Sequence, residues 1–103
     1  MAIVQITKEN FDAEVLQCKQ TVLLDFYADW CGPCRMVSPI VDEIAEERSD
    51  IIVGKINVDE EEALASEFGV FSIPTLVVLK DGKVAEQSAG AKPKARILAM
   101  LEG

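Results

Sequence analysis

The chain has 103 residues, half of them hydrophobic, and 18 acidic against 10 basic side chains give it a formal net charge of −8. This length suits one domain with its own core, and the acidic balance argues against binding nucleic acid or an anionic membrane surface. No apolar run approaches the roughly 18 residues of a membrane span, and no export signal is visible at residues 1–7. We therefore expect a single domain over residues 1–103, working in the cytoplasm as a monomer.

Short apolar segments alternate with amphipathic ones, which predicts an α/β fold. The first half is expected to form a strand at 3–6, a helix from a Thr7 cap to about Cys18, a strand at 22–28 and a helix from Pro33 to about Arg48, kinked at Pro39. The second half is expected to form a strand at 51–58, a helix from an Asp59 cap to about Phe68, strands at 75–80 and 83–88, and a helix at 92–101. Asp81-Gly82 predicts a tight antiparallel hairpin, and strands separated by helices pair in parallel. The expected result is a mixed sheet with helices on both faces.

Two cysteines lie three residues apart where the second strand turns into the second helix, in the segment Trp30-Cys31-Gly32-Pro33-Cys34. Pro33 suits the first turn of a helix, where its missing N–H would have no partner anyway. A helix N-terminus carries roughly half a positive elementary charge, which favours a thiolate over a thiol. Residues i and i+3 on one turn lie roughly 5–6 Å apart, a separation that a disulfide tolerates. The pair can be a nucleophilic thiolate or a closed disulfide, which predicts a redox site.

Other interpretations of the cysteines fit less well. A structural zinc site usually takes four Cys or His ligands, and the chain has three cysteines and no histidine, so we expect no metal. A static disulfide across so small a loop would remove little entropy from the unfolded chain. Cys18 lies on the apolar stripe of the first helix, where it is either a buried small hydrophobe or a regulatory thiol. The acidic run at 59–62 is interpreted as a cap and an acidic first turn rather than a metal cluster.

The whole chain resembles the thioredoxin family. The resemblance is carried by the motif at residues 30–34 and, at family-like spacings, by Asp25, Pro39, Lys55, Ile73-Pro74-Thr75, Gly82 and Gly90. A bare Cys-x-x-Cys is only moderately specific, but this combination is far more so. The resemblance implies the thioredoxin fold, a five-stranded mixed sheet flanked by four helices, and a small protein that reduces disulfides in other proteins without a bound cofactor.

The two cysteines have distinct expected roles in the exchange. Cys31 is the expected nucleophile, because it precedes the helix and its sulfur should be exposed beside Gly32, which has no side chain to obstruct a target. Its attack on a target disulfide gives a mixed disulfide. Cys34, a turn deeper and more shielded, then attacks the Cys31 sulfur and releases the reduced target.

Asp25 interrupts an otherwise apolar strand. Central strands of parallel sheets are buried on both faces, so desolvation should raise the pKa of this carboxyl; an edge position facing solvent is the alternative. The resemblance implies that Asp25 is a buried proton acceptor for Cys34, acting through water. The Lys55 ammonium is placed to reach Asp25, the alternative being an ordinary lysine on the strand surface.

The resemblance also implies a cis peptide bond before Pro74, facing the disulfide. Cis geometry there would let the backbone of Ile73 pair with an extended target segment. A shallow apolar surface is expected from Trp30, residues 69–73 and Gly90-Ala91, although Trp30 can also be a half-buried packing residue. The expected substrate-binding residues are Trp30, Gly32, Pro33, Ile73, Pro74 and Gly90. The chain departs from the family at Tyr27, where tryptophan is frequent, and at Ser72, where glycine or alanine is common and a change could alter which targets fit.

Two other functions compete with the reductase. Oxidases and isomerases of the same fold tend to carry a histidine between the cysteines, where this chain has Gly32-Pro33. A binding module with idle thiols is the alternative from another class. For a reductase, the electrons would come from a separate thioredoxin reductase, either a nicotinamide-dependent flavoprotein or a ferredoxin-linked enzyme, and would pass to disulfide-containing target proteins.

Overall fold

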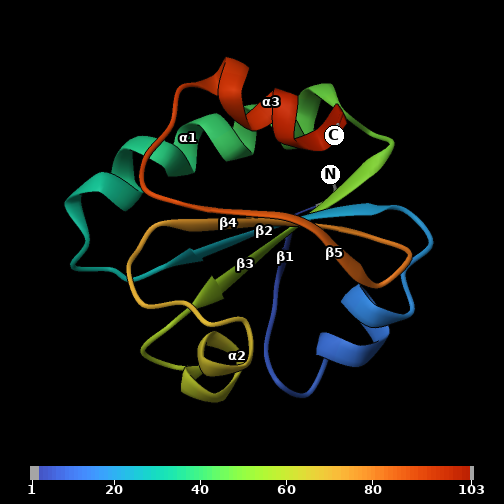
Figure 1. Cartoon of the computed structure of the whole chain (residues 1–103), viewed down its shortest axis with the longest axis horizontal. Coiled ribbons are helices and arrows are strands. Elements are labelled where there is room, and N and C mark those ends of the chain that lie inside the picture. Colours follow the sequence, from blue (N-terminus) through green and yellow to red (C-terminus); the bar gives the residue numbers. More distant parts are fainter. Residues whose placement is uncertain (1–2, 103) are drawn as a thin grey trace.

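The computed structural model describes residues 3–102 and arranges them around one five-stranded sheet (Figure 1). The strands are β1 (Ile3–Gln5), β2 (Thr21–Tyr27), β3 (Ile51–Asn57), β4 (Thr75–Lys80) and β5 (Lys83–Ala89). The helices are the π-helix η1 (Asp12–Leu16) and the α-helices α1 (Gly32–Glu47), α2 (Glu62–Glu67) and α3 (Lys94–Glu102). Within these residues, no helix is both long and apolar enough to cross a bilayer.

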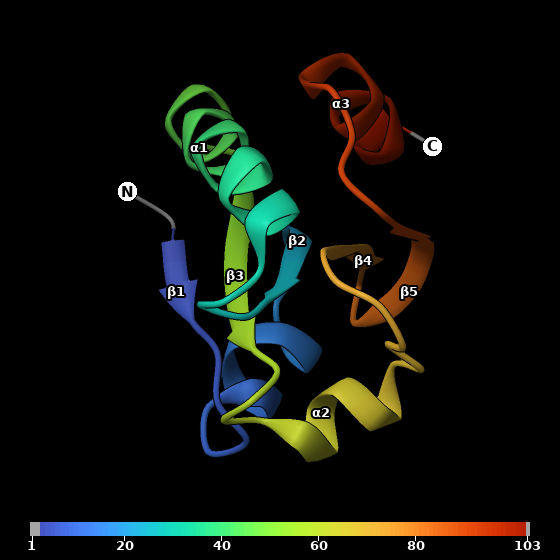
Figure 2. The same cartoon turned by 90° about the vertical axis from the view of Figure 1, so that its left-hand side faces the viewer.

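The sheet is mixed and has the spatial order β1-β3-β2-β4-β5. The strands β1 and β2 pair in parallel with β3, whereas β4 pairs antiparallel with both β2 and β5. Helices α1 and α3 cover one face and α2 lies on the other (Figure 2). The expected fold, a five-stranded mixed sheet with four helices, is confirmed.

The central strand β2 divides its side chains between two cores, because successive residues of a strand point to opposite faces. Leu23 packs into the core under α1 and α3, and Leu24 and Phe26 pack into the core with η1 and α2. All five inner residues of β2 are buried, as expected for a strand covered on both sides. Asp25 is one of them, and alternation places it on the α1 face with Leu23.

The hairpin between β4 and β5 turns at Asp81-Gly82, as predicted. Both residues have positive φ, 54° and 75°, which is the signature of a type I′ turn. Helix α1 continues through Pro39 from Gly32 to Glu47.

The first helix is shorter than expected, and the predicted Thr7 cap is wrong. Asn10 organises the segment instead: its side-chain oxygen accepts the Thr7 N–H at 2.8 Å and its amide donates to the Gln5 carbonyl at 3.0 Å. The π-helix η1 starts only at Asp12, after the helical residue Phe11, and the π-type bond from the Gln17 N–H to the Asp12 carbonyl closes it. Cys18 therefore lies after the helix, half-buried against the core of η1 and α2 rather than fully buried.

The predicted Asp59 cap is also wrong, because α2 begins three residues later, at Glu62. The side chain of Asn57 accepts the Asp59 N–H at 2.9 Å, and its carbonyl accepts the N–H groups of Glu60 and Glu61. Residues 57–61 thus form a turn before the helix starts. The Asp59 carboxylate does not cap the helix and instead accepts a hydrogen bond from the Trp30 indole.

Candidate active site

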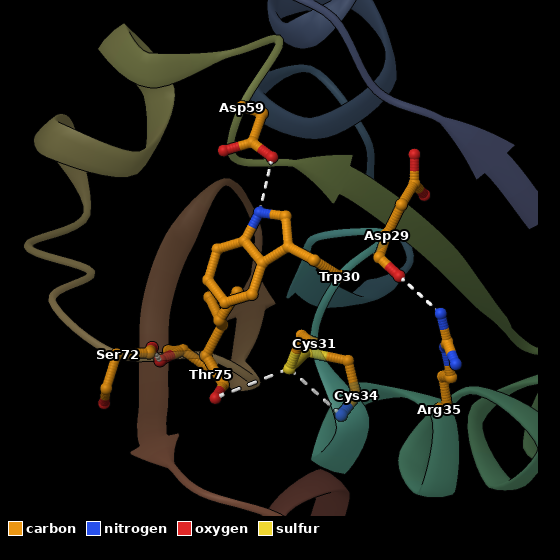
Figure 3. Close-up of a disulfide and its surroundings, with 9 residues drawn as sticks. Asp29, Trp30, Cys31, Cys34, Arg35, Asp59, Ser72 and Thr75 are labelled. Atoms are coloured by element: carbon orange, nitrogen blue, oxygen red, sulfur yellow. Dashed lines mark hydrogen bonds between the residues drawn. A yellow bond between two sulfur atoms is a disulfide. The ribbon is translucent and has the colours of Figure 1, made fainter.

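Cys31 and Cys34 form a disulfide at the start of α1 (Figure 3). Cys31 is the N-cap residue, with extended backbone angles, and Pro33 follows in the first turn. The backbone N–H of Cys34 donates to Sγ of Cys31 at 3.2 Å. A sulfur thus takes the place that a serine or aspartate oxygen takes at most helix starts. This donor and the positive end of the helix both stabilise negative charge on Cys31.

The expected difference in exposure between the two cysteines is wrong for the disulfide form. Cys31 is 3% exposed and Cys34 is 4% exposed. Both pack with Ala28 against half-buried neighbours that include Ile73. Burial therefore does not distinguish the two residues, but hydrogen bonding does, because Sγ of Cys31 accepts the N–H of Cys34.

The loop before β4 lies against the disulfide. The Ile73–Pro74 peptide bond is cis, as predicted, and the Ile73 carbonyl oxygen lies 3.8 Å from Sγ of Cys31. Two bonds hold the loop: Thr75 Oγ1 donates to the Ser72 carbonyl at 2.6 Å, and the Gly90 N–H donates to the Pro74 carbonyl at 2.8 Å. The structure therefore brings Cys31, Ile73 and Pro74 together, with Gly90 behind the proline.

An apolar surface lies beside the disulfide. Trp30 is 69% exposed, which excludes the half-buried interpretation, and its indole N–H donates to Asp59 at 2.8 Å (Figure 3). A shallow pocket of about 200 Å³ is lined by Trp30, Val58, Val70, Phe71, Ser72 and Ile73. Phe71 is 99% exposed. Phe71 was expected only as part of the range 69–73; an aromatic residue next to the cis-proline loop was the available signal.

Asp25 is buried, 1% exposed, and lies between Lys55 of β3 and Leu76 of β4 in the sheet register. The alternative of an edge position facing solvent is therefore wrong. Its Oδ1 has no hydrogen-bond partner among the described residues. Desolvation raises the pKa of this carboxyl to about 6, while the Lys55 ammonium lowers it and the Asp42 carboxylate raises it.

Lys55 does not donate to Asp25, contrary to the expected contact. Its ammonium donates to Ser38 Oγ at 2.8 Å and to Asp42 Oδ1 at 2.6 Å, both on α1. The side chain is only 15% exposed, so the surface alternative is also wrong. Ser38 and Asp42 were not among the predicted site residues; their i, i+4 spacing on the helix that follows the motif was the available signal.

Comparison with known proteins covers almost the whole chain. The family model described as Thioredoxin matches residues 2–103. The chain is 50% identical to the thioredoxin of Bacillus subtilis over 95 residues, 91% of this chain and 89% of the relative. It is 49% identical to the thioredoxin of Pyropia yezoensis over 102 residues, 98% and 95% of the two chains. It is 48% identical to thioredoxin 1 of Synechococcus elongatus over 98 residues, 94% and 92% of the two chains. With its cysteine pair closed at the start of α1, the chain belongs to the thioredoxin family of thiol–disulfide oxidoreductases.

Proposed function

We propose that this member of the family is a cytoplasmic, monomeric reductase of protein disulfides, recharged by a separate flavin- or ferredoxin-linked thioredoxin reductase. The observation that carries the proposal is the hydrogen bond from the Cys34 N–H to Sγ of Cys31 at the start of α1. In the reduced protein the same N–H stabilises a thiolate on Cys31. The thiolate is the attacking species in thiol–disulfide exchange.

The exchange proceeds in two displacements. The Cys31 thiolate attacks one sulfur of the target disulfide, which breaks that bond, forms a mixed disulfide and releases the first target thiolate. The Cys34 thiol then loses its proton and attacks Sγ of Cys31, which releases the second target thiolate. The target gains two electrons and the chain ends as the Cys31–Cys34 disulfide seen in the structure.

Asp25 is the base that we propose for the second displacement. It is the buried titratable group on the α1 face of β2, and its pKa of about 6 leaves it mostly ionised at neutral pH. A base of this strength can accept the Cys34 proton and return it to solvent afterwards. Lys55 contributes through the charge it presents to Asp25.

The target segment binds, in our proposal, along the loop beside the disulfide. An extended chain that pairs with the backbone of Ile73 would bring a target sulfur close to Sγ of Cys31, which lies 3.8 Å from the Ile73 carbonyl. Trp30 would give the target an apolar contact on one side, and the exposed Gly32 and Pro33 would leave the approach open. Pro74 and Gly90 would hold the loop in place.

A trapping experiment tests these assignments. We expect Cys34→Ser to accumulate covalent adducts with a disulfide-containing protein, because the mixed disulfide can no longer be resolved, and Cys31→Ser to form none. Non-reducing gels and intact mass measure the adducts. Cys18→Ser is the matched control, because this third cysteine is not part of the disulfide, and it should behave like the native protein. Adducts that form only with Cys31→Ser would reverse the two roles.

A further inference from the structure

An ion pair joins Lys55 of β3 to Asp42 of α1 close to the buried carboxyl of Asp25, and neither Asp42 nor its neighbour Ser38 has a part in the mechanism proposed above. We propose that Ser38 and Asp42 are positioning residues for the exchange reaction, which anchor the Lys55 ammonium and thereby set the charge that Asp25 faces. The inference deepens the proposed function, since it concerns the base of the second displacement.

Lys55 lies beside Asp25 in the sheet, but the Lys55 ammonium binds side chains of α1. The two residues are paired in the register of β2 and β3, so both side chains project toward α1. A lysine in this position has a buried carboxylate next to it as a potential partner. Its ammonium instead donates to Ser38 at 2.8 Å and to Asp42 at 2.6 Å, and Asp25 Oδ1 stays without a partner among the described residues.

Few charged or titratable groups face Asp25. From β3 it faces Lys55, from α1 it faces Asp42, and from β4 its register partner is the uncharged Leu76. Asp42 acts on Asp25 in two ways, and both raise the pKa of the Asp25 carboxyl. Its negative charge makes ionisation of Asp25 harder, and its bond to the ammonium restrains the one cation that would make ionisation easier.

Anchoring has a chemical consequence for the base. A carboxylate that formed a direct ion pair with Lys55 would hold its charge tightly and accept a proton poorly. With the ammonium held by α1, Asp25 keeps a proton affinity suited to taking the Cys34 proton near neutral pH. Ser38 also lines a pocket of about 200 Å³ together with Cys34 and Tyr27. One of the two residues that hold the Lys55 ammonium therefore shares a pocket with the cysteine of the second displacement.

The test measures the titration of Asp25 in variants of the anchor. We expect Asp42→Asn to shift the midpoint of the Asp25 titration downward by about 0.5–1 pH unit, because both effects of Asp42 are lost. Ser38→Ala should shift it in the same direction by less, and Lys55→Met should shift it upward. Carbon NMR of the Asp25 carboxyl in the oxidised protein gives the midpoint, and the pH dependence of mixed-disulfide resolution should move with it.

The chain offers a matched control in Glu43, the residue next to Asp42 on α1. Glu43→Gln removes the same charge, but Glu43 pairs with Lys94 at 2.7 Å and does not contact Lys55. It should leave the Asp25 midpoint unchanged. An Asp42→Asn midpoint that equals the Glu43→Gln midpoint, or that moves upward, overturns the inference. A native chain that reduces no protein disulfide overturns the proposed function instead, and the NMR titration separates the two results because it needs no turnover.

Discussion

Burial and two neighbouring charges together set the pKa of the Asp25 carboxyl, and they do not all act in the same direction. Burial raises the pKa of the carboxyl to about 6, the Lys55 ammonium lowers it, and the Asp42 carboxylate raises it again. The result lies within about one unit of neutral pH, where a general base is both ionised and strong enough to take a proton. If Asp25 is the base that we propose, the charges beneath α1 set the rate of the second displacement through this one residue.

We expect Asp25→Asn to slow the resolution of a mixed disulfide roughly tenfold or more at neutral pH, because the amide cannot accept the Cys34 proton. The slowing should fade below about pH 6, where the native Asp25 is itself protonated. The decay of a preformed adduct between Cys31 and a target, followed from about pH 5 to about pH 8, measures this. Asp29→Asn, at an exposed carboxylate beside the motif, is the control. Equal rates for Asp25→Asn and the native protein across that range would remove Asp25 from the mechanism.

At the scale of elements, the hairpin of β4 and β5 depends on one glycine for two separate reasons. Gly82 has a φ of 75°, in the left-handed region that side chains rarely adopt. A Cβ at this position would also lie 2.5 Å from the Leu16 carbonyl oxygen of η1, a backbone atom that cannot swing away. The turn therefore packs directly against η1 at a point with no room for a side chain.

We expect Gly82→Ala to lower the free energy of unfolding by at least about 2 kcal/mol, because it adds a collision to the backbone strain. Gly69→Ala is the matched control: Gly69 also has positive φ, 66°, but a Cβ there would meet nothing within 4 Å. The Gly69→Ala variant therefore measures the cost of the backbone strain without a steric clash. Urea unfolding measures the loss in free energy of unfolding for both variants. A loss for Gly82→Ala no larger than that for Gly69→Ala would contradict the expected clash with the Leu16 carbonyl oxygen.

The elements also show what the sequence can and cannot predict. The central strands, α1 and the hairpin were predicted to within a few residues, because apolar periodicity and turn residues act locally. The helix starts at Thr7 and Asp59 were wrong because the side chains of Asn10 and Asn57 bind backbone groups and hold turns there.

The disulfide motif and the cis proline were predictable, since the residues themselves carry the resemblance. The hydrogen bonds that hold the Lys55 ammonium were not predictable from the sequence. Its contacts with Ser38 and Asp42 depend on how α1 docks on the sheet, which periodicity does not specify. The burial of Cys31 was missed for the same reason, because it follows from packing against Ile73, far along the chain.

At the scale of the whole molecule, few polar side chains of the described residues enter the core, and those that do lie on the three central strands of the sheet. Among residues 3–102, the buried polar or charged side chains are Asp25, Asn57 and Thr75, on three different strands. Asn57 accepts a backbone N–H and Thr75 donates to a carbonyl, so both are satisfied. Asp25 Oδ1 is not. Among the described residues, the fold therefore keeps one buried carboxyl oxygen without a partner, on the residue that we propose as the base.

This group makes the stability of the molecule depend on pH. The pKa of Asp25 is about 6 in the folded protein against 3.8 for an unperturbed aspartate, so between these values the folded state binds more protons than the unfolded state. Stability contributed by the protonated carboxyl is thus complete below about pH 4 and is lost as the pH rises through 6. The gap of about two pKa units corresponds to about 3 kcal/mol.

We expect Asp25→Asn, which stays neutral, to gain stability relative to the native protein as the pH rises. The difference in unfolding free energy should grow by about 3 kcal/mol between about pH 4 and about pH 8, with its midpoint near the pKa of the carboxyl. Urea unfolding of both proteins at each pH measures it, and taking the difference cancels the titration of the exposed carboxylates. Glu43→Gln, an exposed carboxylate on α1, should show no such growth. A difference that stays constant with pH would mean that the pKa of Asp25 is the same in the folded and the unfolded protein, which would contradict the raised pKa.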